Sequence, residues 1–369
     1  MRHTDMKITD GHLMLYWCFD IADEIDISML ERQPGWQAEK ALLSGIRITP
    51  EYIQYSTPPL LLKLGNQKLP RGLDAIVEMK VYEFGVVTIR FTSVIECELE
   101  QLVHLSRFVQ ESSEIRALAI EWLKKTIDRI ITAAVRPVKS PESDWEDYAI
   151  FWIHGFDRKM NDELLLKEYG DCISKILRAE EKQSSQEKED ALKYPLSYYG
   201  EDLTLIDWGS AFIYDPWKTF DVLDVIEFSV IQLLELRVYD KILDKAIENA
   251  YDDLAAQRKR KLKIVTISSV LSRFSRIKLD ISDVIDRLEN FLKLVGDLYL
   301  AKVYTAASNR FYLDRWKLAV RNKLNIIESL YAKEWERFQT TRMVVAEIAI
   351  VVLFIIDIIL IFFEVLKSR

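Results

Sequence analysis

The C-terminal segment, residues 343–366, most constrains what this chain can fold into. Eighteen of its 24 residues are Val, Ile, Leu or Phe. As a helix it would reach about 36 Å, which is enough to cross a hydrocarbon core about 30 Å thick. A buried helix of a soluble domain is rarely apolar on every face over such a length. The sequence therefore predicts a single transmembrane helix.

Three acidic residues, Glu347, Asp357 and Glu364, interrupt this segment. An acidic residue at the bilayer centre costs about 2.5–3.5 kcal/mol, and each apolar residue there contributes about 0.3–0.6 kcal/mol, so the apolar sum is expected to prevail. Asp357 and Glu364 are seven residues apart and share one helix face. Two interpretations stay open. Either they form a polar stripe between packed helices, or Glu364 is interfacial and Asp357 is tolerated.

The N-terminus and the cysteines predict where the rest of the chain lies. The first ten residues lack the apolar core of a signal peptide. The three cysteines are too far apart for a disulfide framework or a CxxC metal site, which favours a reducing compartment. We therefore expect a single-pass protein with a C-terminal anchor, whose body is cytoplasmic or lies in a matrix-like compartment.

The body is predicted to be α+β, with two similar lobes. Hydrophobic residues make up 49% of the chain, which allows a substantial core. β-Branched and aromatic runs predict strands in both lobes, and helical patterns follow them. The expected strands are 13–19, 60–64, 75–81, 85–91, 148–153 and 204–214, and the expected helices are 95–134, 162–178 and 221–256. The predicted parts are a lobe at 1–135, a linker at 136–146, a second lobe at 147–263, a helical hairpin or stalk at 264–342, and the transmembrane helix at 343–366.

The predicted hairpin consists of helices at 281–306 and 311–342. Apolar residues recur at a spacing of three or four in the second helix, at Val320, Leu324 and Ile327. This face fits a coiled-coil seam between two copies of the chain or lateral packing within one copy, and both interpretations stay open.

Two segments resemble a known family. The run 81–91 (VYEFGVVTIRF) is similar to the YGVVVFWG…EE segment of the required-for-meiotic-nuclear-division (Rmd/Sif-type) proteins, and 225–243 resembles their SHALAQSxKLxxFE helix. The long C-terminal helix is similar as well, although the family's DTPDFFW-like run is missing near 264–279. The resemblance implies a membrane-anchored protein without established catalysis. Some members act at the mitochondrial inner membrane in support of translation.

Acidic residues on the predicted helix 221–256 are the weak catalytic candidates. Glu227 and Glu235 lie on one broad flank, and Asp207 lies at a strand end. Paired carboxylates can hold a cation or act as acid and base, but they more often form a structural polar network. No phosphate-binding motif occurs. Because the four histidines show no local ligand spacing, no metal and no cofactor are predicted. These histidines are His3, His12, His104 and His154.

A basic cluster is the best interaction candidate. Five of the six residues at 258–263 are cations: Arg258, Lys259, Arg260, Lys261 and Lys263. They could contact anionic lipid headgroups at about 1 kcal/mol per cation, or RNA phosphates, for example on a ribosome. They could equally be the solvated C-terminus of a helix.

These features favour a non-enzymatic scaffold or assembly factor, tethered to a membrane, whose body binds a macromolecular partner. The first alternative is a membrane-anchored, metal-dependent hydrolase that uses the carboxylates of the 221–256 helix. The second is an RNA or ribosome tether that acts through the basic cluster.

Overall fold

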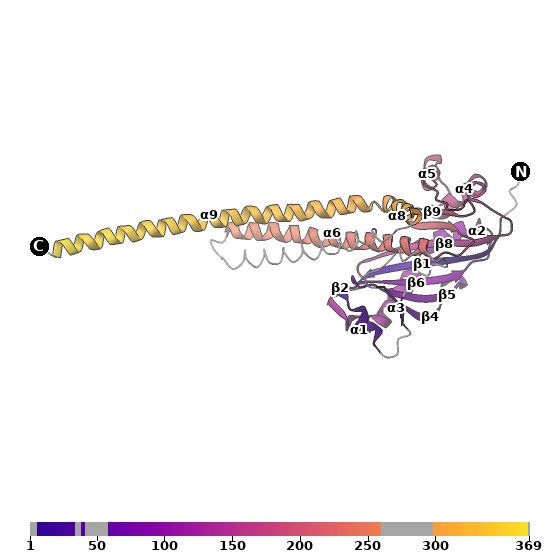
Figure 1. Cartoon of the computed structure of the whole chain (residues 1–369), viewed down its shortest axis with the longest axis horizontal. Helices are drawn as coiled ribbons and strands as arrows, with labels where there is room; N and C mark the ends of the chain where they lie inside the picture. The colour runs from indigo at the N-terminus through magenta and orange to yellow at the C-terminus, as the bar shows by residue number, and fades with distance from the viewer. Residues whose placement is uncertain (1–5, 34–37, 41–57, 260–297, 368–369) are drawn as a thin grey trace. The chain divides into compact units, whose positions relative to one another are not determined.

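The computed structural model describes residues 6–33, 38–40, 58–259 and 298–367 (Figure 1). Its backbone contacts divide the chain into two units, which are described separately. The first contains the described residues of Met1–Tyr239 and Val284–Lys317, and the second contains those of Asp240–Asp283 and Leu318–Arg369.

An eight-stranded mixed sheet is the centre of the first unit, with the order β3-β4-β5-β6-β1-β8-β10-β9. All neighbours are antiparallel except β8 and β10, which are parallel. Strands β2 and β7 form a separate two-stranded sheet. The bounds are β1 Ile8–Asp20, β2 Ala22–Ile25, β3 Ala38–Lys40, β4 Leu60–Lys68, β5 Asp74–Val81, β6 Val86–Val94, β7 Ala134–Pro137, β8 Trp145–Phe156, β9 Leu203–Ile206 and β10 Ser210–Tyr214.

One face of the sheet packs against helices α2, α3 and α4. Alternate residues of β1, such as Leu13 and Phe19, join one core with apolar residues of these helices, such as Leu123 and Ile173. Each fully buried side chain of this kind contributes about 1.5–3 kcal/mol. The helices of the first unit are α1 Ile27–Glu31, α2 Gln101–Glu111, α3 Ser113–Ile131, α4 Asp162–Arg178, α5 Ser185–Ala191 and α8 Leu298–Arg310, and a 3₁₀ turn, η1, spans Pro70–Gly72.

The first half of α6 (Asp221–Lys259) lies on the opposite face. There Lys80 of β5 bonds to Asp224 and Glu227 of this helix. The residues of β1 that point to this face alternate with those of the apolar core, and they include His12 and Tyr16. The sheet is therefore buried on both sides, which explains why its central strands are apolar almost without interruption.

The second unit contains the rest of α6 and most of α9 (Leu313–Lys367). Lys323 of α9 lies 2.7 Å from Asp240 and 2.6 Å from Asp244 of α6, measured from its Nζ to an Oδ1 atom. Val320, Leu324 and Ile327 are buried within the chain. These contacts are of the lateral kind, and the partner of α9 here is α6. The predicted helix at 281–306 lies partly outside the described residues, and its end is α8.

The predicted transmembrane helix at 343–366 is wrong. These residues belong to α9, and none of the helices that the structure describes is long and apolar enough to span a bilayer. The acidic residues Glu347, Asp357 and Glu364 fall within 18 consecutive positions and oppose insertion. The predicted single-pass localisation with a C-terminal anchor is corrected accordingly.

The α+β class is confirmed, and the two predicted lobes are joined by a shared sheet. The predicted strand runs all lie within observed strands or overlap them, and α6 starts at the predicted residue 221. However, β1 of the first lobe pairs with β8 of the second over most of its length. The similarity of the two lobes and their boundary at 136–146 stay predictions.

The burial of Asp20, at the end of β1, is expected to make the stability of the folded protein depend on pH. Burial raises the pKa of Asp20 to about 7, and the nearby charges of Asp144 and Asp23 act in the same direction. Because the folded-state pKa exceeds the ordinary value, the folded state binds this proton more tightly than the unfolded state. The resulting stability is fully present below about pH 4 and is lost as the pH rises through about 7.

We therefore expect Asp20→Asn to raise the free energy of unfolding at pH 8 by about 2–4 kcal/mol. At pH 4 the same variant should differ little from the wild type. Urea denaturation at the two pH values measures this difference. Asp74→Asn, which changes an exposed aspartate of the same sheet, is the control. A gain for Asp20→Asn that is equal at both pH values would contradict the assignment.

Candidate metal centre

The acidic candidate Glu227 lies in a buried ion-pair network. Its carboxylate lies 2.6 Å from Lys80 Nζ and accepts a hydrogen bond of 2.9 Å from the hydroxyl of Tyr82. Lys80 also bonds to Asp224, and the Glu227 side chain is only 2% exposed. Strand β5 and helix α6 are thus joined by charges that already bind one another, as in the structural polar network described above for such paired carboxylates.

The other two acidic candidates lie elsewhere. Asp207 lies between β9 and β10, where its Oδ2 is 2.6 Å from Arg178 and its Oδ1 is 3.6 Å from Arg310. Burial raises the pKa of Asp207 although both arginines oppose this shift. Glu235 is buried on α6. Neither residue belongs to a group that could hold a metal ion among the described residues.

The basic cluster is described only in part. Arg258 and Lys259 are the last two residues of α6, and Arg260, Lys261 and Lys263 lie outside the described residues. Asp357 is exposed on α9. Glu364 belongs to the same helix. The lipid or RNA contacts expected of the basic cluster stay predictions, whereas the transmembrane setting expected for Asp357 and Glu364 falls with the predicted membrane helix.

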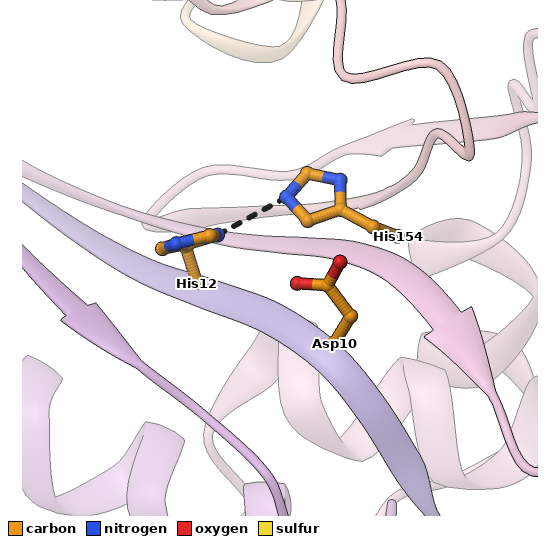
Figure 2. A group of neighbouring side chains, drawn as sticks. All are labelled: Asp10, His12 and His154. Atoms are coloured by element: carbon orange, nitrogen blue, oxygen red, sulfur yellow. Dashed lines mark hydrogen bonds between the residues drawn. The ribbon is translucent and has the colours of Figure 1, made fainter.

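The residues that converge as metal ligands are Asp10, His12 and His154. Their potential ligand atoms all lie within 4.8 Å of one another (Figure 2). Asp10 and His12 come from β1 and His154 comes from β8. The group therefore joins residues that are 142 positions apart in the sequence.

Strand pairing explains why these side chains meet. His12 is the register partner of Trp152, and His154 lies two residues further along β8. Residues two apart in a strand point to the same face, so both histidines and Asp10 emerge on the side of the sheet that faces α6. Register shifts on either side of Asp10 mark a bulge at this point, and bulges commonly redirect side chains beside functional sites.

At the bulge, apolar side chains pack closely against Gly11 on the face of β1 opposite to the metal group. A Cβ atom at this position would lie 3.1 Å from side-chain atoms of Ile8 and Ile153. The neighbours would have to yield to accommodate it. The core can close beneath Asp10 and His12 because this residue has no side chain.

The tautomer of His154 follows from its hydrogen bonds. Its Nδ1 lies 3.0 Å from the backbone carbonyl oxygen of Asp215. A carbonyl can only accept, so Nδ1 carries the hydrogen and Nε2 carries the lone pair. That Nε2 lies 3.1 Å from Nδ1 of His12. Metal-binding histidines commonly donate their other N–H to a carbonyl in this way.

The protonation states also suit a metal. Burial lowers the pKa of His12 and of His154, so both imidazoles are neutral at neutral pH. The hydrogen bond from Lys218 lowers the pKa of Asp10, which is therefore ionised. Neutral imidazoles and a carboxylate are the forms in which these side chains bind metal ions.

The loop between β10 and α6 supports the group from one side. Lys218 Nζ lies 2.7 Å from Oδ2 of Asp10, and Lys218 has a left-handed backbone with φ 58°. The Asp215 carboxylate accepts hydrogen bonds from the backbone N–H groups of Trp217 and Thr219, at 2.9 and 2.6 Å. These bonds hold the loop in a conformation that non-glycine residues seldom adopt.

The ring of Trp152 packs against both histidines. The ring of Trp152 lies 4.3 Å from that of His154 and 6.0 Å from that of His12, centroid to centroid. Phe220 packs on Trp152 at 4.9 Å. The indole Nε1 of Trp152 is buried, and the described residues offer it no hydrogen-bond acceptor.

This group was missed from the sequence because its ligands lie on different strands. A search for local spacing such as HxxxH cannot detect such a site. The sequence does contain a signal for this site, since His12 directly precedes the predicted strand 13–19 and His154 directly follows the predicted strand 148–153. Pairing those strands in antiparallel order would have brought the two histidines together.

Comparison with known proteins gives the family. The family model described as "Uncharacterized protein MJ0711, N-terminal domain" matches residues 10–221, more than half of the chain. The chain belongs to the MJ0711 family. Its similarity to MJ0711 of Methanocaldococcus jannaschii is 27% identity over 323 residues, which covers 79% of this chain and 96% of that protein. No solved structure matches.

Membership of the MJ0711 family overturns the resemblance to the required-for-meiotic-nuclear-division proteins. The matched region includes the run at 81–91 on which that resemblance rested. In the structure this run covers the end of β5, the turn and most of β6. A β-branched hairpin of this kind recurs in unrelated sheets, because its residues suit paired strands in general. The MJ0711 match contains all three residues of the metal group.

Proposed function

We propose that this protein binds one divalent transition-metal ion through Asp10, His12 and His154, and that the ion activates water for hydrolysis. The observation that carries the proposal is the convergence of two imidazoles and one carboxylate, whose potential ligand atoms lie within 4.8 Å of one another. Two histidines and one carboxylate are a recurring ligand set for Zn²⁺ and Fe²⁺.

The distances fit an ion between the rings. Two nitrogens that each lie about 2.0–2.1 Å from a tetrahedral ion are about 3.3 Å apart. The facing nitrogens of His12 and His154 are 3.1 Å apart. Without a metal, the hydrogen on His12 Nδ1 bridges the two rings. An ion held by both nitrogens would take the place of that hydrogen, and His12 would then carry its hydrogen on Nε2.

Three protein ligands leave the ion open to water. Structural zinc sites are usually closed by four protein ligands, whereas catalytic sites keep one position for water or substrate. An ion held by Asp10, His12 and His154 would lower the pKa of a water bound to it to about 7 and would so supply a nucleophile for hydrolysis. The scaffold and RNA-tether roles expected from the sequence stay predictions.

Metal analysis of the full-length protein tests the proposal. After saturation with Zn²⁺ and dialysis, we expect one ion per chain in the wild type and in His104→Ala, which removes an exposed histidine of α2. The double variant His12→Ala/His154→Ala should retain no stoichiometric zinc. Equal zinc contents in the double variant and the wild type would refute the site.

A further inference from the structure

A set of exposed aromatic side chains lies on the segments before β9 and after β10. We call it the aromatic ledge, and it consists of Tyr198, Tyr199, Trp217 and Phe220. Their exposed fractions are 54%, 46%, 38% and 36%. Tyr198 contacts Tyr199 at 4.4 Å and Tyr199 contacts Trp217 at 4.8 Å, between ring centroids. Large rings in contact with one another and with solvent are typical of ligand-binding surfaces.

The ledge is held in place although it is exposed. The Asp202 carboxylate accepts hydrogen bonds from the backbone N–H groups of Tyr198 and Tyr199, the shortest at 2.7 Å. Asp215 holds the backbone of Trp217 in the same manner. A surface that is ordered before binding loses little conformational entropy when a ligand arrives. These rings are thus prepared to stack against a flat partner.

The ledge and the metal centre share one loop. Lys218, which bonds to Asp10, follows Trp217 directly. Phe220 packs on Trp152, which contacts both histidines. The segment 217–220 therefore carries both ledge residues and residues that contact the metal centre.

The charge of the metal centre indicates which chemical group of a ligand would bind there. An imidazole binds a metal ion only in its neutral form, and the charges of Asp10 and Lys218 cancel, so a bound divalent ion would leave the centre with two uncompensated positive charges. A phosphate monoester dianion balances them and offers oxygens to the ion and to Lys218.

We propose that the ledge and the metal centre together bind a nucleoside monophosphate, with its base stacked on Trp217 and its phosphate at the ion and Lys218. This inference rests on the proposed metal site. A neutral sugar could stack on the same rings but would leave the charge of the ion uncompensated. A nucleic-acid strand fits less well, because the net charge of the chain is −8 and its field opposes a polyanion.

Calorimetric titration of adenosine 5′-monophosphate into the zinc-loaded full-length protein tests the proposal. We expect saturable binding of one molecule per chain and weaker binding, by at least about tenfold, of adenosine and of ribose 5-phosphate. Trp217→Ala should weaken binding of the monophosphate by about 5- to 150-fold, the range found when stacking on one base is removed. Its zinc content should stay at one ion per chain.

Trp208→Ala is the matched control. Trp208 is 49% exposed. It precedes β10, whereas Trp217 follows that strand. This variant should bind the monophosphate as the wild type does. Equal binding by Trp217→Ala and the wild type would overturn the inference, as would preferential binding of maltotriose. A chain that holds one zinc ion but no monophosphate refutes the nucleotide proposal alone, whereas a chain that holds no zinc refutes the metal site as well.

Discussion

Replacing Lys80 with methionine is expected to lower the free energy of unfolding by about 3–5 kcal/mol, the usual effect of removing one partner from a buried ion pair. Lys80 is 9% exposed and Glu227 is 2% exposed. In the variant, Glu227 keeps its bond from Tyr82 but loses its cation. A carboxylate left in this position must remain charged at high cost or take up a proton.

Urea denaturation at neutral pH measures this loss. In the double variant Lys80→Met/Glu227→Gln no uncompensated charge is left at Glu227, so it should recover part of the stability. Lys68→Met, which changes an exposed lysine at the end of β4, should stay within about 0.5 kcal/mol of the wild type. If Lys80→Met were as stable as Lys68→Met, the ion pair would not join the sheet to α6.

Zinc is expected to stabilise the wild-type protein and not the His154→Ala variant. An ion that binds only the folded state adds about 2.7 kcal/mol when its free concentration is 100 times Kd. Removing one of three ligands should weaken binding by at least about 100-fold, since changes in the groups that merely support ligands already cost 10- to 100-fold. At the same zinc concentration the variant should gain about 0.4 kcal/mol or less.

Chemical denaturation with and without Zn²⁺ tests this difference. His104→Ala should gain as much stability from zinc as the wild type does, because its imidazole is exposed on α2, and its ion pair is with Glu181. Magnesium should stabilise the protein much less, since Mg²⁺ prefers oxygen ligands. Equal stabilisation of His154→Ala and the wild type would place the zinc at another site.

Much of the secondary structure could be predicted from local sequence patterns. The β-branched run at 85–91 and the apolar run at 148–153 became β6 and β8, because such residues suit strands that are buried on both faces. The start of α6 was also predicted. Strand order could not be predicted in this way, because the pairing of β1 with β8 depends on residues more than 100 positions apart.

The apolar C-terminal segment shows a different limit. Its composition predicts a membrane helix, but its three acidic residues interrupt the apolar stretch, and the helix that contains it begins 30 residues earlier, at Leu313. A hydropathy average over residues 343–366 alone does not show that this segment is the end of a much longer helix.

The candidate site was the least predictable part. Glu227 and Glu235 are predicted as candidates because they are acidic residues on an apolar helix, and the structure shows both to be buried. The metal group depends instead on a bulge in β1, on the carbonyl of Asp215 and on the backbone of Lys218. None of these features has a local sequence signature, because each arises from contacts between distant segments.

X-ray absorption spectroscopy at the zinc edge of the loaded full-length protein identifies the metal ligands. We expect two imidazole nitrogens at about 2.0–2.1 Å and oxygen ligands at about 2.0–2.2 Å, with the multiple-scattering pattern of two rings. In His154→Ala the contribution of one imidazole should be lost. A spectrum with no imidazole, or one that is the same in the variant and the wild type, would contradict the assignment of His12 and His154 as ligands.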